Sequence, residues 1–462
     1  MQYSVVDYQS IVDASHSLRF DAEFFRPDYL QVQRRLEAIG SRKLIDFQVN
    51  IRHPKEIKRN YVDNGVLLLR GQNVRPLSID LTANPVYISE EDAERLKENT
   101  IHYKDILIMR SGANVGQCAI YLEDSPAISM SDTLIIRSSI LNPFFLAIFL
   151  NSRYGKALIE RGKYGSAQPH IAPSFLYQIP VPNWEHLQTE IEKTYLQSKE
   201  LTELSKTRYA ETQTLLLSEL GLADWQPKHT LAFATDYASM QRAERIDADY
   251  FQPKYDEIEK GIENYSAKSI KIRDEFKQNK SIFEIDPEKL YRYVEIGSVN
   301  VSTGEIVAEE VLGKDLPANA KRVLKKGDII ISKVRTYRGA ITVIQQDGYV
   351  GSGAFCVLKE NGQINKETLL ACLRSKLFLT WSWKPNTGTS YPTLDDDDIL
   401  DFPIPIPPKE KQAEIKQKVD ESFNLRKHAK DLLECAKRAV EIAIEQDEQS
   451  AIDWLKSVSS VP

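Results

Sequence analysis

Polar and apolar residues follow one another along this chain in patterns that predict a mixed, α+β protein. Short apolar runs follow Asp105 and Asp328, and each predicts a buried strand because turn residues bound it. Residues 184–219 and 409–447 contain neither proline nor glycine and predict two long polar helices. Globular stretches of short strands and a few helices are therefore expected to alternate with long helices.

Two closely similar nonapeptides open the two halves of this pattern. "RFDAEFFRP" occupies residues 19–27 and "RIDADYFQP" occupies residues 245–253. After each, apolar positions step by four, three and four residues, which is one face of a helix. These positions are Phe25, Tyr29, Val32 and Leu36 in the first half, and Phe251, Tyr255, Ile258 and Ile262 in the second. The simplest interpretation is structural: a helix start, with Pro27 or Pro253 in its first turn, docked on a core.

The repeat continues through both halves, at an offset that slips from 226 to 223 residues. The matching stretches are "LLLRGQNV" (67–74) with "YVEIGSVN" (293–300), "KDILIMRSGANVGQCAI" (104–120) with "GDIIISKVRTYRGAITV" (327–343), and "KYGSAQPHIAPSFLYQIPVP" (163–182) with "PNTGTSYPTLDDDDILDFPIPIP" (385–407). In each half a predicted strand ends in a basic, glycine-punctuated turn. The chain is therefore predicted to be an internal pseudo-twofold repeat.

Each half ends in one of the long helices. In the second helix, apolar and small residues alternate steps of four and three, which predicts a coiled-coil seam with two soft spots. The seam positions are Ile415, Val419, Ser422, Arg426, Ala429, Leu433, Ala436, Val440 and Ala443. The first helix has a broken stripe of Leu187, Ile191, Leu201, Leu204, Leu215 and Leu216. We expect the two helices to pair with each other, antiparallel, as an internal spacer.

Length and composition constrain the number of domains and the class of protein. A chain of 462 residues predicts two or more domains. Its four cysteines are scattered without metal-ligand spacing, so we expect reduced thiols and no metal site. No apolar run is long enough to span a bilayer and no secretory start is evident, which predicts a cytoplasmic protein. The net charge of −6 argues mildly against nucleic-acid binding, although local patches decide that question.

This plan resembles the specificity subunit of type I restriction-modification systems, over nearly the whole chain. The stretches that carry the resemblance are the two nonapeptides, "KDILIMRSGANVG" and "GDIIISKVRTYRG" in the middle, and "QIPVP" and "FPIPIPPKEKQAEI" before the helices. Their order, occurring twice, is specific, whereas any one of them is weak. One departure is that "VPNWEHLQTEI" (181–191) is a degenerate version of the Pro-Pro-x-x-x-Gln pattern at 407–412.

The resemblance implies a non-catalytic, sequence-specific DNA-binding subunit. Two tandem, strand-rich target-recognition domains would each read one half of a split site in double-stranded DNA. The paired helices would form a spacer that docks two methyltransferase subunits, and restriction (motor) subunits would join when restriction is active. S-adenosylmethionine would belong to the methyltransferase, with no cofactor on this chain. The implied boundaries are 1–183 and 221–406 for the recognition domains, 184–220 for the first spacer helix, and 407–462 for the second helix and tail.

Basic clusters inside the predicted recognition domains favour DNA contact despite the net charge. Residues 321–338 hold seven Lys or Arg against one Asp, and residues 42–59 hold six against Asp46 and Glu56. A charge run is usually only a solvated face, but here the runs fall where DNA contact is expected. The acidic residues gather elsewhere, as in "DDDD" (395–398), which we expect to favour a helix N-terminus.

Candidate base-reading residues are those on glycine-rich loops whose side chains suit base edges. Arg and Lys suit guanine, and Asn and Gln suit adenine. In the first half the candidates are Arg70, Gln72, Asn73, Arg110, Ser111, Asn114, Lys163, Gln168 and His170. In the second half they are Ser298, Asn300, Lys333, Arg335, Thr336, Tyr337, Arg338, Asn386, Thr389 and Tyr391. For any single residue, stabilising a turn or contacting a phosphate is the commoner role.

Motifs for catalysis on this chain are weak. "NPVY" (84–87) is one residue from an amino-methyltransferase motif, but no glycine-rich cofactor loop accompanies it. "EIK" at 56–58 and 414–416 fits a nuclease pattern only loosely, and no nucleotide-binding P-loop is present. The alternatives left open are a specificity subunit of a type IIB-like or other phage-defence methylation system, a helical scaffold that binds only proteins, and a stand-alone methyltransferase.

Overall fold

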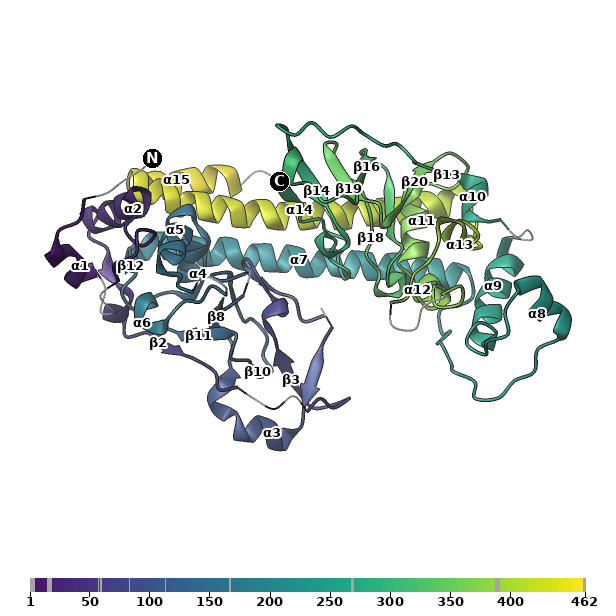
Figure 1. Cartoon of the computed structure of the whole chain (residues 1–462), viewed down its shortest axis with the longest axis horizontal. Coiled ribbons are helices and arrows are strands. Elements are labelled where there is room, and N and C mark those ends of the chain that lie inside the picture. The colour runs from purple at the N-terminus through teal and green to yellow at the C-terminus, as the bar shows by residue number, and fades with distance from the viewer. Residues whose placement is uncertain are drawn as a thin grey trace. The chain divides into compact units, whose positions relative to one another are not determined.

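The computed structural model describes residues 5–14, 19–56, 58, 60–82, 84–112, 114–165, 168–266, 270–386 and 391–459. The chain forms two units. Unit one comprises Met1–Thr202 and Arg426–Pro462, and unit two comprises Glu203–Leu425. Figure 1 labels the elements, in which strand-rich sheets accompany long helices. The α+β class predicted from the sequence is therefore confirmed.

Unit one contains two four-stranded sheets. In the first, with order β6-β3-β10-β7, strands β3 and β10 are parallel neighbours. In the second, with order β2-β11-β8-β9, all neighbours are antiparallel. The strands are β2 (Asn50–Arg52), β3 (Val66–Leu69), β6 (Val86–Ile88), β7 (Thr100–Ile101), β8 (Ile106–Met109), β9 (Cys118–Ile120), β10 (Ala127–Ser129) and β11 (Thr133–Arg137). Two short pairs are added: β1 (Arg42–Lys43) with β12 (Pro180–Val181), and β4 (Val74–Arg75) with β5 (Ser78–Ile79).

Unit two contains two four-stranded sheets of the same connectivity. Their orders are β15-β14-β19-β16, with β14 parallel to β19, and β13-β20-β17-β18, antiparallel throughout. The strands are β13 (Phe276–Gln278), β14 (Leu290–Val294), β15 (Glu309–Leu312), β16 (Ala320–Leu324), β17 (Ile329–Ser332), β18 (Ile341–Val343), β19 (Tyr349–Ser352) and β20 (Phe355–Glu360). Each strand occupies the place of one strand of unit one, so the sequence repeat is also a repeat of sheet topology.

Helices complete each unit. Unit one has α1 (Tyr8–Ala14), α2 (Pro27–Ala38), α3 (Glu90–Arg95), α4 (Pro143–Asn151), α5 (Arg153–Gly162), α6 (Pro173–Leu176) and α15 (Glu448–Ser459). Unit two has α8 (Tyr237–Ala243), α9 (Pro253–Ser266), α10 (Ile272–Glu275), α11 (Lys366–Leu373), α12 (Lys376–Trp381) and α13 (Asp396–Leu400). The long helices α7 (Glu185–Glu219) and α14 (Lys409–Glu445) each contribute to both units. The acidic run begins α13, with Asp395 as its N-cap, as predicted.

The repeated nonapeptide makes the same contacts in both units. Arg19 forms an ion pair with Asp21 at 2.7 Å and lies near the carbonyl oxygens at the end of α5. Arg245 pairs with Asp247 at 2.7 Å and donates to the Pro385 and Asn386 carbonyl oxygens at 3.2 Å. Each aspartate also accepts from the backbone N–H three residues later. The predicted structural role of the repeated motif is thereby confirmed.

The arginine lowers the pKa of the aspartate in both motifs. The hydrogen bond from Arg19 holds the pKa of Asp21 below its ordinary value, and Arg245 does the same for Asp247. A carboxylate that accepts several hydrogen bonds is stabilised in its charged form.

The glutamine of the Pro-Pro-x-x-x-Gln pattern makes the same contact in both halves, although the first half has only a degenerate version of the pattern. Gln412 on α14 accepts the Asn365 N–H at 3.0 Å, where Asn365 caps α11. Gln188 on α7 accepts the Asn142 N–H at 2.9 Å, where Asn142 caps α4. Both glutamines are buried. Each long helix is therefore tied to its unit by a glutamine that satisfies the N-cap residue of a buried helix.

The buried seam of α14 follows the prediction. Seven of the nine predicted positions are buried, and Arg426 and Leu433 are half-buried. Ser422, one of the soft spots, is fully buried.

The predicted stripe of α7 was wrong in part. Leu187, Ile191 and Leu216 are buried as predicted, but Leu204 is 39% exposed. The buried line of this helix also includes four polar residues: Thr194, Ser198, Ser205 and Thr212. Hydroxyls on this line donate to carbonyl oxygens: Thr212 to its own helix, and Ser198 to Ala429 at 2.7 Å in unit one. Small polar residues therefore form this seam because their hydroxyls find acceptors in the two backbones.

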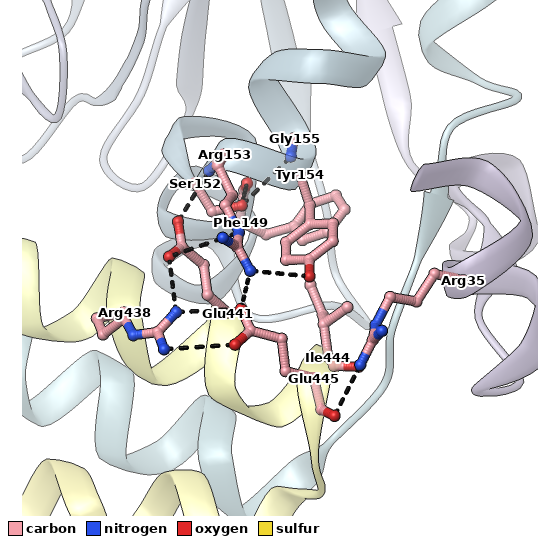
Figure 2. A network of polar contacts seen from close by, with 10 residues as sticks. All are labelled: Arg35, Phe149, Ser152, Arg153, Tyr154, Gly155, Arg438, Glu441, Ile444 and Glu445. Carbon is pink, nitrogen blue, oxygen red and sulfur yellow. Dashed lines mark hydrogen bonds and ion pairs between the residues drawn. The ribbon is translucent and has the colours of Figure 1, made fainter. Parts of the chain in front are cut away.

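A polar network fixes the end of α14 within unit one (Figure 2). Arg35 donates to the Ile444 and Glu445 carbonyl oxygens at 3.1 and 2.7 Å, which caps the last turn of the helix. Glu441 accepts the Arg153 backbone N–H at 3.0 Å, at the start of α5. Helix α14 is thereby joined to α5, which lies more than 280 residues earlier in the chain.

Candidate nucleic-acid interface

In unit one, loops from three strands are held together at Asp132. The Gly71 N–H, after β3, donates to the Asp132 carboxylate at 2.9 Å. The Arg110 N–H, after β8, donates to the Asp132 carbonyl oxygen at 2.8 Å. A Cβ at Gly71 would lie 2.5 Å from the Asp132 carboxylate, so the close approach requires glycine. The predicted turns at 70–73 and 110–116 are thus neighbours.

The segment around His170 joins this group of loops. Ser111 and His170 form an antiparallel bridge, and Tyr164 pairs with His170 on the other side. The His170 Nδ1 lies 2.6 Å from the Gln168 carbonyl oxygen, and the rings of Tyr164 and His170 are 5.9 Å apart. Predicted candidates that lie far apart in sequence, such as Ser111 and His170, are therefore brought together.

The side chains of these loops differ in their exposure to solvent. Gln72, Asn114 and Gln168 are exposed, whereas Arg70, Arg110 and Lys163 are half-buried. The buried Nε atoms of Arg70 and Arg110 have no hydrogen-bond partner among the described residues.

Several of the predicted side chains in unit one have local partners. The Arg70 guanidinium donates to the Asn84 carbonyl oxygen, and the Asn114 side-chain oxygen accepts from the Gln117 amide at 3.2 Å. Asn73 is 2% exposed and its amide bonds the Arg70 N–H and the Asp80 carbonyl oxygen, so this side chain stabilises the turn. Lys163 forms an ion pair with Glu160.

In unit two, the loop after β17 is fixed by backbone hydrogen bonds on two sides. The Lys333 N–H donates to the Ala354 carbonyl oxygen at 2.9 Å, and the Arg335 N–H donates to the Pro392 carbonyl oxygen at 2.8 Å. Arg335 has a φ of 48°, a left-handed conformation that is uncommon for a residue with a side chain. Thr336 is buried, and its hydroxyl donates to the Ser332 carbonyl oxygen at 2.7 Å. These contacts hold the backbone of the loop in place, so the loop forms a fixed platform for its side chains.

Aromatic and arginine side chains gather on this platform. Tyr337 stacks on Trp383 with ring centroids 4.1 Å apart and an interplanar angle of 24°. The Arg335 guanidinium lies 5.7 Å from the ring centre of Tyr391, and that of Arg338 lies 6.0 Å from Tyr337. Tyr391, Trp383 and Arg338 are exposed. Aromatic faces interleaved with arginine suit contact with nucleic acid.

The other candidates of unit two serve turns or lie outside the description. Ser298 accepts the Glu295 N–H, and Asn300 accepts the N–H groups of Ser302 and Thr303. Asn386 accepts the Thr393 N–H at 3.0 Å. Lys333 forms an ion pair with Asp396 at 3.2 Å. Thr389 lies outside the described residues.

The basic cluster of 321–338 is divided in space by β17. Lys325 and Lys326 precede this strand and are exposed, whereas Lys333, Arg335 and Arg338 follow it. Four residues at about 3.3 Å each separate the two groups by about 13 Å. The interpretation of this stretch as one patch was therefore too simple, because a buried strand interrupts the basic sequence.

Sequence reasoning missed Trp383 and Asp132. Trp383 stands two residues after α12, in a stretch whose aromatic and lysine residues could have pointed to it. Asp132 carried no signal, because an acidic residue is not expected beside loops that are predicted to contact DNA. Its role is to hold Gly71 and Arg110 in place.

Neither a metal site nor a membrane span is found in the part of the chain that the structure describes. No cluster of three or more metal-ligating side chains occurs among those residues. Burial raises the pKa of the Cys118, Cys356 and Cys372 thiols to about 12, which keeps them protonated. Among the described helices, none combines the length and the apolar character needed to cross a bilayer.

Comparison with known proteins shows that the chain is similar to DNA-specificity proteins. Residues 260–434 match the family model described as the type I restriction modification DNA specificity domain. The EcoDI specificity subunit of Escherichia coli is 26% identical over 121 residues, which is 26% of this chain and 27% of that protein. The MjaVIII specificity subunit of Methanocaldococcus jannaschii is 23% identical over 360 residues, 74% of this chain and 79% of that protein.

A solved structure adds a further likeness. The type I restriction-modification S subunit from M. genitalium has 12% identity, covers 90% of this chain and 95% of its own, and has a TM-score of 0.35. The match to the E. coli protein spans about a quarter of that relative's length. The family model and the curated relatives therefore indicate a type I restriction-modification specificity subunit, a kind of protein known as non-catalytic.

Proposed function

We propose that this chain reads a bipartite site in double-stranded DNA, with one half-site for each recognition domain. The observation that supports this is a repeated scaffold with unequal loops. Both units have the same sheet topology. The loop residues, however, differ at equivalent positions of the repeat. Asn114 of the first half corresponds to Tyr337 of the second, and Gln168 corresponds to Tyr391. The same fold with different side chains at the same place suits two different half-sites.

In unit two, Arg335 and Arg338 are the base-reading candidates that the geometry favours. Their loop is fixed by its backbone. Arg338 lies beside Tyr337, which stacks on Trp383, and Arg335 lies beside Tyr391. Arginine can bond both acceptors of guanine in the major groove, and such a pair contributes about 1–3 kcal/mol of discrimination.

In unit one, the candidates are the exposed amides of Gln72, Asn114 and Gln168, together with the half-buried Arg70 and Arg110. Amide side chains suit adenine and arginines suit guanine or phosphate. The DNA-contacting set thus differs in chemistry between the two halves.

The remaining assignments follow the family. Residues 1–183 and 221–406 are proposed as the recognition domains, and 184–220 and 407–462 as an antiparallel coiled-coil spacer. Hydrogen bonds such as Ser198 to Ala429 support the pairing in unit one. Two methyltransferase subunits would dock on the spacer and hold S-adenosylmethionine, and restriction (motor) subunits would join them. The complex would act on DNA in the cytoplasm.

A methylation map tests the proposal. The chain is co-expressed with the methyltransferase encoded beside it, in a host that lacks modification, and modified bases are located by sequencing. We expect a split motif of two short specific parts around a fixed spacer. Neutralising Lys333, Arg335 and Arg338 together should relax or abolish one part only, because these residues lie in unit two. An assembled complex that methylates nothing would contradict the proposal.

Two other interpretations give different results in the same experiment. A type IIB-like or other phage-defence system would give a split motif with different partner subunits. A helical scaffold that binds only proteins would assemble with partners, and the triple substitution would leave DNA binding by the complex unchanged.

A further inference from the structure

The segment that opens each unit exposes two apolar side chains at matching positions. Tyr8 is 69% exposed and Phe20 is 67% exposed in unit one. Tyr237 is 73% exposed and Ile246 is 87% exposed in unit two. Each tyrosine begins a seven-residue helix, α1 or α8, and follows an aspartate. The matched residues are Asp7, Tyr8, Ser10, Ala14 and Phe20 with Asp236, Tyr237, Ser239, Ala243 and Ile246.

The folding of each unit does not explain these exposed side chains. In the same motif, Arg19 and Asp21 hold the end of α5, and Phe24 is buried. Phe20 and Ile246 bury little surface by comparison. One exposed apolar residue is ordinary, but the same pair recurring in both copies needs a reason. Exposed tyrosine and phenylalanine are residues that protein interfaces use as anchors.

The charge around these residues suits a protein partner and not DNA. Residues 5–28 contain five acidic residues and two arginines. Residues 234–252 contain four acidic residues and two arginines. An acidic surface repels phosphate and attracts a partner with lysine and arginine at the same place. The exposed carboxylates include Asp249 and Glu23, whose side chain is 68% exposed and also pairs with Arg26 at 2.8 Å.

We propose that the two opening segments, the described residues 5–14 and 19–28 in unit one and 234–252 in unit two, are matched docking surfaces for two copies of one protein subunit. The contact face of that subunit would offer an apolar pocket for Tyr8 and Phe20, or for Tyr237 and Ile246, within a basic border. Two identical copies bound to one chain require the same surface twice, and these segments supply it. The inference rests on the proposed function, in which two methyltransferase subunits join the chain, and it extends their contact beyond the spacer helices.

The test uses the full chain co-purified with the methyltransferase subunit encoded beside it. Native mass spectrometry gives the number of subunits bound, and titration gives their affinity. The variants are Tyr8→Ser with Phe20→Ser, Tyr237→Ser with Ile246→Ser, and all four together. Ile140→Ser in unit one and Val307→Ser in unit two are matched controls, because both residues are more than half exposed and lie outside the segments.

We expect each double variant to lose one of two bound subunits, through at least about tenfold weaker binding, and the quadruple variant to lose both. Charge reversal at Glu23 and Asp249 to lysine should weaken binding independently of any apolar change. Unchanged stoichiometry and affinity in the quadruple variant would overturn the inference alone. A wild-type chain that binds no methyltransferase would instead overturn the proposed function. Unaltered thermal unfolding of each variant confirms that folding is retained.

Discussion

Ser205 and Ser422 donate hydrogen bonds to each other's backbone carbonyl oxygen, each at 2.8 Å. Their hydroxyl oxygens are 3.1 Å apart, and both residues are fully buried. The bond is reciprocal, with the same residue type on α7 and on α14. A serine at this point lets two helix backbones approach closely while each hydroxyl has an acceptor.

Replacing either serine by alanine should therefore weaken the helix pair modestly. Each of Ser205→Ala and Ser422→Ala removes a buried hydrogen bond worth about 1 kcal/mol, with no donor left unsatisfied. The double variant should lose less than the sum of the two, because the hydroxyls share one site. Hydrogen exchange of amides 201–209 measures the loss. Ser218→Ala, on the exposed side of α7, is the matched control, and an equal effect there would contradict the prediction.

Ser205→Leu should be far more damaging than either alanine variant. A leucine at a position where the backbones approach closely cannot be accommodated without separating the helices, and overpacking typically costs about 1–3 kcal/mol. The sequence rule that prefers leucine at a seam position would predict the opposite sign. Hydrogen exchange of the same amides distinguishes the two results.

The ion pair of the opening motif should make stability depend on acid pH. The pKa of Asp247 is held below its ordinary value by Arg245, so the unfolded chain binds its proton more readily than the folded chain. The pair therefore stabilises the fold fully above about pH 4, the ordinary aspartate pKa, and the contribution is lost as the pH falls below it. The denaturation midpoint of Asp247→Asn should lie below that of the wild type at pH 6, and the gap should close toward pH 3.

Asp224→Asn controls for the change of side chain, because Asp224 is exposed. A gap between wild type and Asp247→Asn that stays constant from pH 6 to pH 3 would show that the ion pair is not responsible.

Gln412 should be more important than its place in a polar helix suggests. Its amide accepts the Asn365 N–H at 3.0 Å and donates to the Pro407 carbonyl oxygen at 2.9 Å, in a site that is 3% exposed. Gln412→Ala leaves the half-buried Asn365 N–H without this acceptor, which costs about 1–3 kcal/mol. Faster hydrogen exchange at the start of α11 is the expected result. Gln417→Ala, exposed on the same helix, should show no change.

The sequence predicted the scaffold better than the site, for physical reasons. Apolar runs and the spacing of repeated motifs report burial, and burial decides which strands and helices form. They therefore located β8, β17 and the seam of α14. The role of Gln188 was not predicted, because it depends only on the side-chain amide of this residue. The proline pair of the Pro-Pro-x-x-x-Gln pattern is not needed for that contact.

The loop residues were harder to assign because their types allow several roles. Asn73 and Asn300 are used by turns, whereas Asn114 is exposed, and nothing in the local sequence separates them. The roles depend on which loops meet, as at Asp132, and that is fixed by tertiary contacts. The buried serine and threonine positions of α7 were not predicted for the same reason. Their burial depends on tertiary contacts, because their hydroxyls find acceptors that include carbonyl oxygens of another helix.

The division of the basic cluster predicts that its two ends act differently on DNA. Arg338→Ala removes an exposed guanidinium beside Tyr337, whereas Lys326→Ala removes an exposed charge before β17. In the assembled complex, Arg338→Ala should weaken binding by about 1–3 kcal/mol and relax one base position of one half-site. Lys326→Ala should leave the methylated motif unchanged. Motif maps and binding measured at a stated salt concentration compare the two, and the same motif for both variants would contradict this assignment.

A spacer formed by α7 and α14 should behave as a ruler. Seven residues inserted into each helix, at the level of Ser205 and Ser422, keep the repeat of the seam and lengthen the pair by about 10.5 Å. At about 3.4 Å per base pair, the unspecified spacer of the methylated site should grow by about three base pairs. Both half-sites should keep their sequences, because neither set of loops has changed. A map that shows the original spacer in a complex of normal composition would mean that the helices do not set the distance between the half-sites.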